Sequence, residues 1–274
     1  TNHAPPNAKA YTMTTVLITG AAGSIGRALA HRFYTRERAQ LALLDFEPEP
    51  LAKLNTALRT QGAHTLPLEC DVTDPEQVSS AVAQAVDHFG GLDIVIANAG
   101  TVHRSRFSDT DLKVFRKVME VNFFGALYTA KAALPALKRS KGLIIVTSSI
   151  AGVAPLYGRT GYAASKHALH GLFESARTEL QEEGVRVMMV CPTFTRSAFE
   201  QRAMGPDGNP AGTKRTTTGT MAEPQDVADA VIDGACRGRT LLVLSTTGKL
   251  AYFLSRLAPG YYARAMVRRL TGKR

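Results

Sequence analysis

Short apolar runs alternate with longer amphipathic segments along most of this chain. The apolar runs are mostly continuous rather than alternating, which is typical of parallel strands that helices cover on both faces. Seven such runs predict strands at residues 15–19, 41–45, 65–70, 94–97, 143–148, 185–191 and 241–245. The segments between them predict helices at residues 24–34, 48–60, 75–89, 110–139, 161–183 and 224–236.

This order of elements predicts an α/β fold in which a doubly wound parallel sheet carries helices on both faces. Asp74, before a proline, is a good start for the third helix, and Ser108 or Asp109 is expected to cap the fourth. No internal repeat or interdomain linker is found. We therefore expect one catalytic domain over residues 13–246, a disordered lead-in at 1–12 and a C-terminal extension at 247–274. Within the domain, residues 193–221 are the least regular and are expected to form the substrate loop.

The composition is that of an ordinary globular chain. It has 274 residues, of which 45% are hydrophobic and 20% charged, enough apolar material for one buried core. No run of about eighteen apolar residues occurs, so no membrane-spanning helix is expected. Cys70, Cys191 and Cys236 lie far apart, with neither a disulfide framework nor metal-ligand spacing. Free thiols, a cytoplasmic location and no metal site are the expectation.

The net charge of +10 is unevenly distributed. Nine basic residues and no acidic one fall between Ala235 and Arg274, which leaves 24 basic against 23 acidic residues in the rest of the chain. A basic excess confined to the tail is not the signature of a nucleic-acid-binding domain. We therefore expect no nucleic acid partner.

The basic tail has an apolar stripe at helical spacing. Its members are Leu250, Phe253, Leu254 and Leu257, then, after a Pro-Gly break at 259–260, Tyr261, Tyr262, Ala265, Met266 and Leu270, with Arg264, Arg268 and Arg269 between them. One interpretation is a pair of interfacial helices that touch an anionic membrane, which would make the protein peripheral to it, or that bring a lipophilic substrate to the pocket. The other, which we favour, is that the stripe packs on the substrate pocket or on a neighbouring subunit. Both remain open at this point.

A glycine-rich turn follows the first predicted strand directly. The sequence reads Thr19-Gly20-Ala21-Ala22-Gly23-Ser24-Ile25-Gly26, and a predicted helix begins within it. Glycines allow a sharp turn and a close approach to a diphosphate, while the helix N-terminus offers N–H groups and a positive dipole end. The turn therefore predicts a dinucleotide site at Gly20, Gly23, Ser24, Ile25 and Gly26.

Asp45 ends the second predicted strand, 19 residues after Gly26. A carboxylate there can accept hydrogen bonds from both hydroxyls of an adenosine ribose and repels a ribose phosphate. Phe46 follows it, with no arginine beside it to hold such a phosphate. NAD is therefore favoured over NADP. The alternative is that Asp45 only caps a loop.

Tyr162 and Lys166 stand four residues apart on one face of a predicted helix. A phenol with a pKa near 10 is too weakly acidic to act as a base at neutral pH, but an ammonium one turn away lowers that pKa. Ser149, thirteen residues before Tyr162, is placed to donate a hydrogen bond to a substrate oxygen. Ser148 is the alternative candidate for this role. His167 and His170, on the same helix, are interpreted as surface or subunit-interface residues.

Over residues 15–244 these motifs resemble those of the short-chain dehydrogenases/reductases. The resemblance implies a Rossmann-type seven-stranded sheet, a nicotinamide cofactor and a homodimer or homotetramer. It implies a catalytic tetrad of Asn122, Ser149, Tyr162 and Lys166, in which the backbone at Asn122 helps to hold a water. It also implies cofactor contacts by Asp71, by Asn98, Ala99 and Gly100, by Tyr162 and Lys166, and by Pro192 and Ser197.

Three features depart from the family pattern. Gly23-Ser24 reverses the usual order within the turn, Ala97 replaces an asparagine, and Thr193 replaces a glycine after Pro192. The first adds a side chain near the diphosphate and the last stiffens the backbone. None removes a proton-transfer group.

The sequence thus predicts an NAD(P)-dependent oxidoreductase that transfers a hydride between its cofactor and a secondary alcohol or ketone. Phe194, Phe199 and Met204 in the expected substrate loop favour a lipophilic substrate. The alternatives are an NADP-dependent 3-oxoacyl thioester reductase and a non-catalytic dinucleotide sensor on the same fold.

Overall fold

A parallel sheet of seven strands forms the centre of the molecule in the computed structural model, which describes residues 13–196, 199, 201–212 and 221–271. The strands are β1 (Thr15–Thr19), β2 (Gln40–Asp45), β3 (Thr65–Glu69), β4 (Ile94–Ala97), β5 (Leu143–Thr147), β6 (Arg186–Cys191) and β7 (Leu241–Val243). Their order is β3-β2-β1-β4-β5-β6-β7, and every pairing is parallel. The predicted fold class and the seven predicted strands are confirmed.

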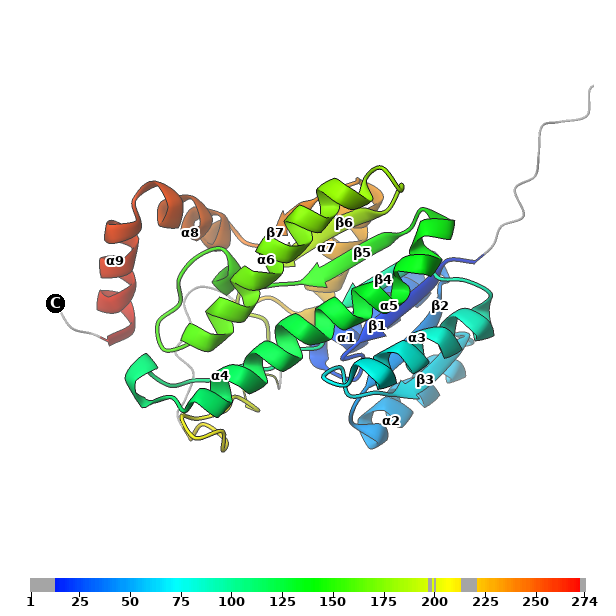
Figure 1. Ribbon diagram of the computed structural model, residues 1–274, viewed down its shortest axis with the longest axis horizontal. Coiled ribbons are helices and arrows are strands. Elements are labelled where there is room, and N and C mark those ends of the chain that lie inside the picture. Colours follow the sequence, from blue (N-terminus) through cyan, green and yellow to red (C-terminus); the bar gives the residue numbers. More distant parts are fainter. Residues whose placement is uncertain (1–12, 197–198, 200, 213–220, 272–274) are drawn as a thin grey trace, which may run out of the picture.

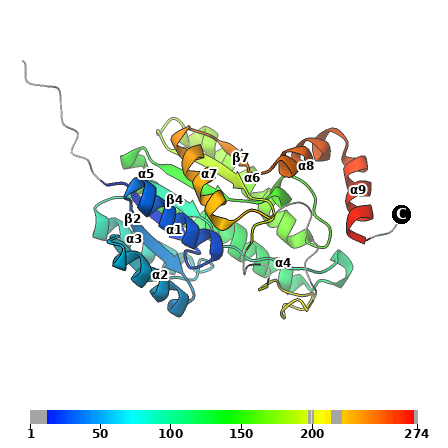
Figure 2. The same cartoon turned by 180° about the vertical axis from the view of Figure 1, so that it is seen from behind.

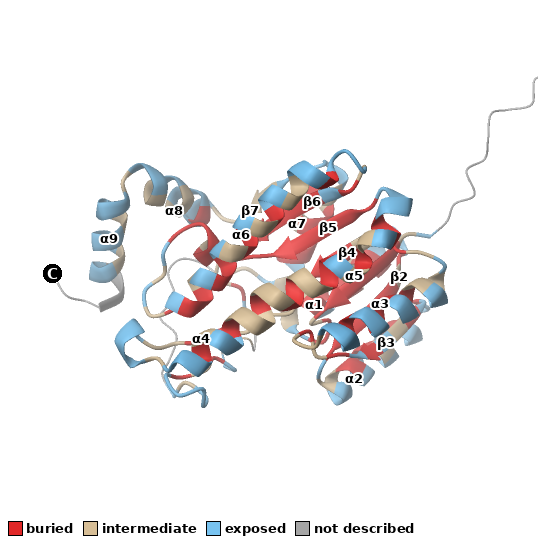
Figure 3. Ribbon diagram, viewed as in Figure 1, coloured by how far each residue is buried: buried red, intermediate tan, exposed pale blue. Residues whose placement is uncertain are grey.

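Helices cover both faces of this sheet. One face carries α3 (Pro75–Phe89), α5 (Gly125–Ser140) and α6 (Thr160–Leu180) (Figure 1). The other carries α1 (Ser24–Glu37), α2 (Pro48–Thr60) and α7 (Pro224–Cys236) (Figure 2). Leu17 of β1 belongs to the core on the first face and Ile18 to the core on the second. Because successive side chains of a strand point to opposite faces, both must be apolar, and Figure 3 shows the central strands β1, β4 and β5 mostly buried.

The strand order reverses at β1, which pairs with β2 on one side and with β4 on the other. Val16 lies opposite Leu41 of β2 and Ile94 of β4. The loops that leave the carboxyl ends of β1 and β4 diverge at this point, and such a divergence is where open α/β sheets bind their ligands. The glycine-rich turn and the Asn98-Ala99-Gly100 segment both begin there.

The starts of two helices test the predicted caps. The Asp74 side chain accepts hydrogen bonds from the backbone N–H groups of Glu76 and Gln77, so the predicted cap of α3 is confirmed. The predicted cap at Ser108 or Asp109 is wrong, because Phe107–Asp109 form a 3-10 turn and α4 (Leu112–Met119) begins only after Asp111. The N–H of Asp111 donates to the carbonyl of Pro206 at 2.8 Å, a tertiary contact that the local sequence does not reveal.

A π-helical segment interrupts the long helix predicted at residues 110–139. The segment Glu120–Phe124 separates α4 from α5 and contains Asn122. A single π turn inside an α-helix shifts the backbone hydrogen bonds of the adjoining turns, and such segments are frequent at functional sites.

The C-terminal residues form α8 (Thr246–Leu257) and α9 (Pro259–Thr271), which lie beside the main body rather than on the sheet (Figure 1). They contact the loop after β5: Ser255 and Arg256 donate to the carbonyl of Val153, and the Tyr262 hydroxyl donates to that of Pro155 at 3.2 Å. No helix within the described ranges is long and apolar enough to cross a membrane.

Candidate active site

The turn after β1 brings the chain into close contact with itself. Gly20 has a φ of +63°, and a Cβ added there would lie 2.8 Å from the Cα of Ala99. A Cβ on Gly26 would lie 2.1 Å from the carbonyl oxygen of Gly20. Both positions therefore require glycine, one for its left-handed backbone and both for lack of space. Gly23 is the N-cap of α1 and offers no side-chain capping bond, with Ser24 and Ile25 in the first turn.

Two side chains hold this turn in place. The Asn98 amide donates to the carbonyls of Thr19 and Gly20 at 3.1 and 3.2 Å. The backbone N–H groups of Asn98 and Ala99 both donate to the Thr19 hydroxyl oxygen. The loops after β1 and β4 are thus cross-linked at the carboxyl edge of the sheet.

Asp45 lies at the end of β2, as predicted, and its side chain is buried. One carboxylate oxygen accepts from the N–H of Ala22 at 2.8 Å and the other from the N–H of Glu47 at 3.2 Å. Burial raises the pKa of this carboxyl, and the backbone N–H groups oppose the rise. The loop-capping alternative therefore describes part of its role, and its selection of a cofactor stays a prediction.

Tyr162 and Lys166 lie one above the other on α6, and both are buried. The Lys166 Nζ lies 5.9 Å from the centre of the Tyr162 ring and donates to the carbonyl of Thr147 at 2.8 Å. Burial lowers the pKa of Lys166 to about 8, because an ammonium is poorly solvated there. A deep cation thus stands beside a phenol at the end of β5.

Ser149 and Ser148 differ in what their hydroxyl groups contact. Ser148 donates to the carbonyl of Lys166 at 3.4 Å, on the packed side of α6. Ser149 begins the 3-10 turn Ile150–Gly152, and its oxygen accepts from the N–H of Ala151 at 3.1 Å. Accepting that bond leaves the Ser149 hydrogen free to donate. Because the 3-10 turn packs on α6 and Ala151 shares an apolar cluster with Tyr162, the geometry favours Ser149.

Asn122 is buried where the π segment meets α6. Its side-chain oxygen accepts from the N–H of Thr101 at 2.7 Å, and its amide donates to the Thr101 carbonyl and to the Ser165 hydroxyl. The side chain therefore joins the loop after β4 to α6, next to Lys166. A Cβ on Gly100 would lie 3.2 Å from the Asn122 oxygen and 3.7 Å from the Lys166 Nζ, which shows how closely these groups converge.

The remaining predicted cofactor residues lie around the same edge. Asp71 follows β3, and its carboxylate accepts from the N–H and the hydroxyl of Thr73. Pro192 follows β6 and is buried, and its carbonyl accepts from the N–H of Ile150 at 3.0 Å. Ser197 lies outside the described residues.

An apolar surface adjoins Tyr162 on the side of the substrate loop. Phe199 lies with its ring centre 6.3 Å from that of Tyr162, and Met204 packs against the same cluster, which also contains Val102 and Ala203. Phe194 is half-buried and takes no part in this cluster. Two of the three predicted loop residues are therefore next to the candidate proton donor.

Several groups at this site were not predicted. The His103 ring is fully buried and accepts a hydrogen bond from the N–H of Gly161, the residue before Tyr162, at 2.9 Å. Arg202 in the substrate loop forms an ion pair with Glu47, two residues after Asp45. Both contacts join segments far apart in the chain, so neither has a local sequence signal.

The two histidines of α6 have different surroundings. His167 is exposed, as predicted. His170 is buried, so the predicted surface position is wrong for it, while the subunit-interface alternative stays a prediction. Its Nδ1 lies 2.7 Å from a Glu174 oxygen and its Nε2 3.5 Å from the Cys191 sulfur, so these polar partners hold it inside.

The residues present fit a dinucleotide. The turn after β1 has glycine at the positions where a Cβ would clash, and the N-terminus of the 14-residue helix α1 follows Gly23. The buried ammonium of Lys166 lies near the carboxyl edge of the sheet. Among the described residues, no group of three or more histidine, cysteine or acidic side chains is placed to hold a metal ion.

Comparison with known proteins identifies the family. The model of the short chain dehydrogenase family matches residues 14–205. Dehydrogenase/reductase SDR family member 7B of Mus musculus is 34% identical over 276 residues, covering 97% of this chain and 84% of the relative. The Drosophila melanogaster dehydrogenase/reductase SDR family protein 7-like is 31% identical over 262 residues, covering 93% and 79%.

Solved structures show the same fold. A short chain dehydrogenase/reductase from Burkholderia phymatum in complex with NAD has a TM-score of 0.82 at 22% identity, covering 92% of this chain and 95% of that one. An alcohol dehydrogenase from Thermococcus sibiricus complexed with 5-hydroxy-NADP has a TM-score of 0.69 at 29% identity, covering 80% and 88%.

The chain therefore belongs to the short-chain dehydrogenase/reductase family. It is an oxidoreductase that acts on CH–OH groups, as the sequence predicted. Nicotinamide cofactors are those of its class, while the choice between NAD and NADP stays a prediction.

Proposed function

We propose that this protein transfers a hydride between a nicotinamide cofactor, with NAD favoured, and a lipophilic secondary alcohol or its ketone. The observation that carries the proposal is the convergence of Tyr162, Lys166, Asn122 and Ser149 beside the turn ending at Gly26. Gly20, Gly23, Ser24, Ile25 and Gly26 would hold the diphosphate, Asp45 the adenosine ribose, and Lys166 the nicotinamide ribose. Asp71, Asn98, Ala99, Gly100, Pro192 and Ser197 would line the rest of the cofactor site.

Tyr162 moves the proton in this proposal. As a phenolate it accepts the alcohol proton during oxidation, and as a phenol it returns the proton to the carbonyl oxygen during reduction. The bound nicotinamide accepts or supplies the hydride. Ser149 donates a hydrogen bond to the substrate oxygen. Such acid–base assistance contributes about two to four orders of magnitude in rate.

Lys166 and Asn122 support that transfer. The buried ammonium stabilises the phenolate and so lowers the pKa of Tyr162. Asn122 fixes the π segment against Thr101 and Ser165, next to Lys166, where a water would return the proton to solvent. Lys166 and Asn122 thus act on the orientation or the ionisation of the Tyr162 phenol. Neither of them touches the substrate carbon that changes oxidation state.

A substrate screen tests the proposal. Wild-type protein would be assayed with secondary alcohols and ketones of increasing apolar size, with both cofactors, by nicotinamide absorbance. The apolar cluster of Phe199, Met204 and Val102 beside Tyr162 supports a rise of kcat/KM with apolar size. Turnover restricted to 3-oxoacyl thioesters with NADP would favour the alternative reductase. Tight cofactor binding with no turnover of any compound would favour the sensor.

A double substitution at Asp45 and Phe46 tests the preference for NAD over NADP. We expect the double change Asp45→Asn and Phe46→Arg to shift the ratio of kcat/KM values toward NADP by about tenfold to a hundredfold, because a charge-assisted bond contributes about 1.5–3 kcal/mol. Asparagine keeps an oxygen for the N–H of Ala22, and Phe46 is 63% exposed, so the turn is preserved. Phe46→Leu is the control. A wild type that already prefers NADP would contradict the assignment of Asp45.

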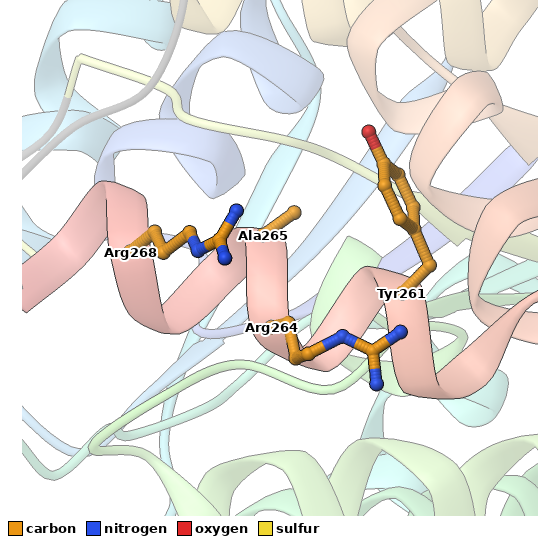
Figure 4. A pocket seen from close by; sticks show the side chains of 4 residues that line it. All are labelled: Tyr261, Arg264, Ala265 and Arg268. Carbon is orange, nitrogen blue, oxygen red and sulfur yellow. The ribbon is translucent and has the colours of Figure 1, made fainter. Parts of the chain in front are cut away.

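The C-terminal helices support a second proposal, namely that they contact an anionic membrane. Tyr262 and Met266 contact the loop at Pro155 and Tyr157. The two helices still expose Leu250, Phe253, Leu257, Tyr261 and Val267. Tyr261, Arg264, Ala265 and Arg268 line a surface hollow on α9 that carries two guanidinium groups and no carboxylate (Figure 4).

Vesicle co-sedimentation distinguishes these interpretations. We expect the full chain to bind phosphatidylserine vesicles more strongly than phosphatidylcholine vesicles. The double change Phe253→Ser and Leu257→Ser is expected to weaken that binding about tenfold or more, because it removes two exposed apolar side chains of α8. Phe107→Ser is the control, since Phe107 is 74% exposed on the 3-10 turn Phe107–Asp109, outside α8 and α9. Equal binding by all variants would leave packing on a neighbouring subunit as the role of this face.

The remaining expectations concern assembly and place in the cell. A homodimer or homotetramer, a cytoplasmic location and the absence of nucleic acid partners stay predictions. A membrane-bound α8–α9 face would make the protein peripheral to a membrane.

A further inference from the structure

His103 lies where three segments of the active site meet. It follows the Asn98-Ala99-Gly100 segment, and its neighbours pair with the substrate loop: the N–H of Arg104 donates to the Met204 carbonyl at 2.7 Å, and the N–H of Met204 donates to the Val102 carbonyl at 2.9 Å. Its ring reaches the start of α6. A fully buried imidazole in this place calls for an explanation, because buried polar groups destabilise a protein unless they are bonded.

The hydrogens of its network can be assigned without ambiguity. The Gly161 N–H can only donate, so the His103 Nε2 accepts and the Nδ1 carries the hydrogen. Nδ1 lies 3.0 Å from the Ser105 oxygen and therefore donates to it. The Thr110 hydroxyl donates to the carbonyl of Arg106, so the Ser105 hydroxyl must donate to Thr110, 2.7 Å away. Each donor is used once, and the chain of bonds has one direction.

The network requires a neutral imidazole. A protonated ring would present N–H to the Gly161 N–H and the bond would be lost. Burial, with a smaller effect from the charge of Arg159, lowers the pKa of His103 to about 4. The ring therefore remains neutral, and the bond intact, throughout the physiological pH range.

Gly161 is the second residue of α6, and Tyr162 follows it. The first N–H groups of a helix have no acceptor within the helix and need one from elsewhere. Arg159 at the N-cap makes no side-chain capping bond, and the first intrahelical bond runs from the Ala163 N–H to the Arg159 carbonyl. His103 thus does for this helix what a capping side chain does for others, from a site 58 residues away in sequence.

We propose that His103 is a positioning residue for proton transfer: it fixes the first turn of α6, and with it the Tyr162 hydroxyl, relative to the substrate loop at Met204. The proposal rests on the function proposed for Tyr162. Proton transfer requires the donor and acceptor within hydrogen-bond reach, and a displacement of about 1 Å can lower a rate about a hundredfold. His103 does not touch the substrate in this role.

Two substitutions at His103 separate positioning from packing. His103→Gln keeps a neutral acceptor that can reach the Gly161 N–H and a donor for Ser105, whereas His103→Leu fills a similar volume with neither. In the leucine variant we expect kcat to fall about tenfold to a hundredfold, KM to change less than about threefold, and the cofactor dissociation constant to stay unchanged. The glutamine variant is expected to recover most of kcat. His167→Leu, at an exposed position on the same helix, is the control.

Amide hydrogen exchange at Gly161, measured by nuclear magnetic resonance, reports on the hydrogen bond from the Gly161 N–H to His103. This measurement does not depend on turnover. We expect slow exchange in wild type and the glutamine variant, and exchange about tenfold faster in the leucine variant. Ser105→Ala, which removes the acceptor for Nδ1 and the donor to Thr110 but leaves the bond from Gly161 to His103, provides a milder change if the leucine variant does not fold, and should lower kcat about threefold to tenfold. Equal kcat in wild type and His103→Leu, or equal loss in the glutamine and leucine variants, would overturn the proposal. A wild type without turnover would reject the proposed function, while Gly161 exchange would still show whether His103 holds the helix start.

Discussion

Tyr162→Phe is expected to lower kcat by about two to four orders of magnitude while leaving cofactor affinity within about twofold of wild type. The substitution removes one oxygen and keeps the ring, which packs with Ala151 and Phe199 and is 8% exposed. Folding and the cofactor turn should therefore be unaffected. What is lost is the group that we propose accepts the alcohol proton, and no other phenol stands beside Lys166 among the described residues.

The measurement is a pair of titrations on the purified full chain. Turnover is followed by nicotinamide absorbance, and cofactor binding by fluorescence in the absence of substrate. Tyr128→Phe provides the matched control, because Tyr128 loses the same atom from a half-buried position on α5. A Tyr162→Phe enzyme that retained half of the wild-type kcat would reject Tyr162 as the proton-transfer group.

The sheet could be predicted from the sequence because parallel strands buried on both faces have a distinctive composition. Leu17 and Ile18 are adjacent and face opposite cores, so the apolar run is continuous. The order of the strands could not be read in this way. The order depends on which strands pair with β1 on its two sides. The pairing of Val16 with both Leu41 and Ile94 cannot be recognised from the local hydrophobic pattern.

Some residues of the candidate site could likewise be predicted from the local sequence, and others could not. Tyr162 and Lys166 could be predicted because one helical turn relates them, and Gly20 and Gly26 because a turn without space for Cβ atoms needs glycine. His103 could not, since its partner Gly161 is brought to it by the fold. The later start of α4 had the same cause, because the carbonyl of Pro206 engages the N–H of Asp111. Long-range hydrogen bonds decided both of these cases.

Asp45 shows why a correct position does not establish a role. The carboxylate was placed at the end of β2 by its distance from Gly26, and it is found there. Each of its oxygens, however, accepts a backbone N–H, and Arg202 pairs with the neighbouring Glu47. The acid therefore stabilises the turn at the rim of the site, apart from the ribose binding that we propose for it, and exchange of its charge is needed to separate the two contributions.

Lys166→Met is expected to lower kcat at neutral pH by about one to three orders of magnitude, since an adjacent cation shifts the pKa of an acid by about one to three units. The same change should move the rise of kcat/KM with pH to higher pH by a similar amount, because Tyr162 would then ionise without the ammonium. The pH profile of the oxidation reaction measures both effects. An unchanged profile would show that Lys166 does not act on the phenol.

Lys166→Met is also expected to change how the free energy of unfolding depends on pH. This second effect distinguishes the loss of the Lys166 charge from a general loss of structure. Burial lowers the pKa of Lys166 from 10.5 to about 8, so between these values the unfolded chain binds a proton that the native chain has released. The free energy of unfolding of the wild type should therefore rise with pH across this window, relative to Lys166→Met, by up to about 3 kcal/mol. Denaturant titrations of the cofactor-free proteins at pH 7 and pH 10 measure this difference, with Lys131→Met, at an exposed position, as the control. Identical pH dependence in wild type and Lys166→Met would mean that burial does not lower the pKa of Lys166 in the native protein.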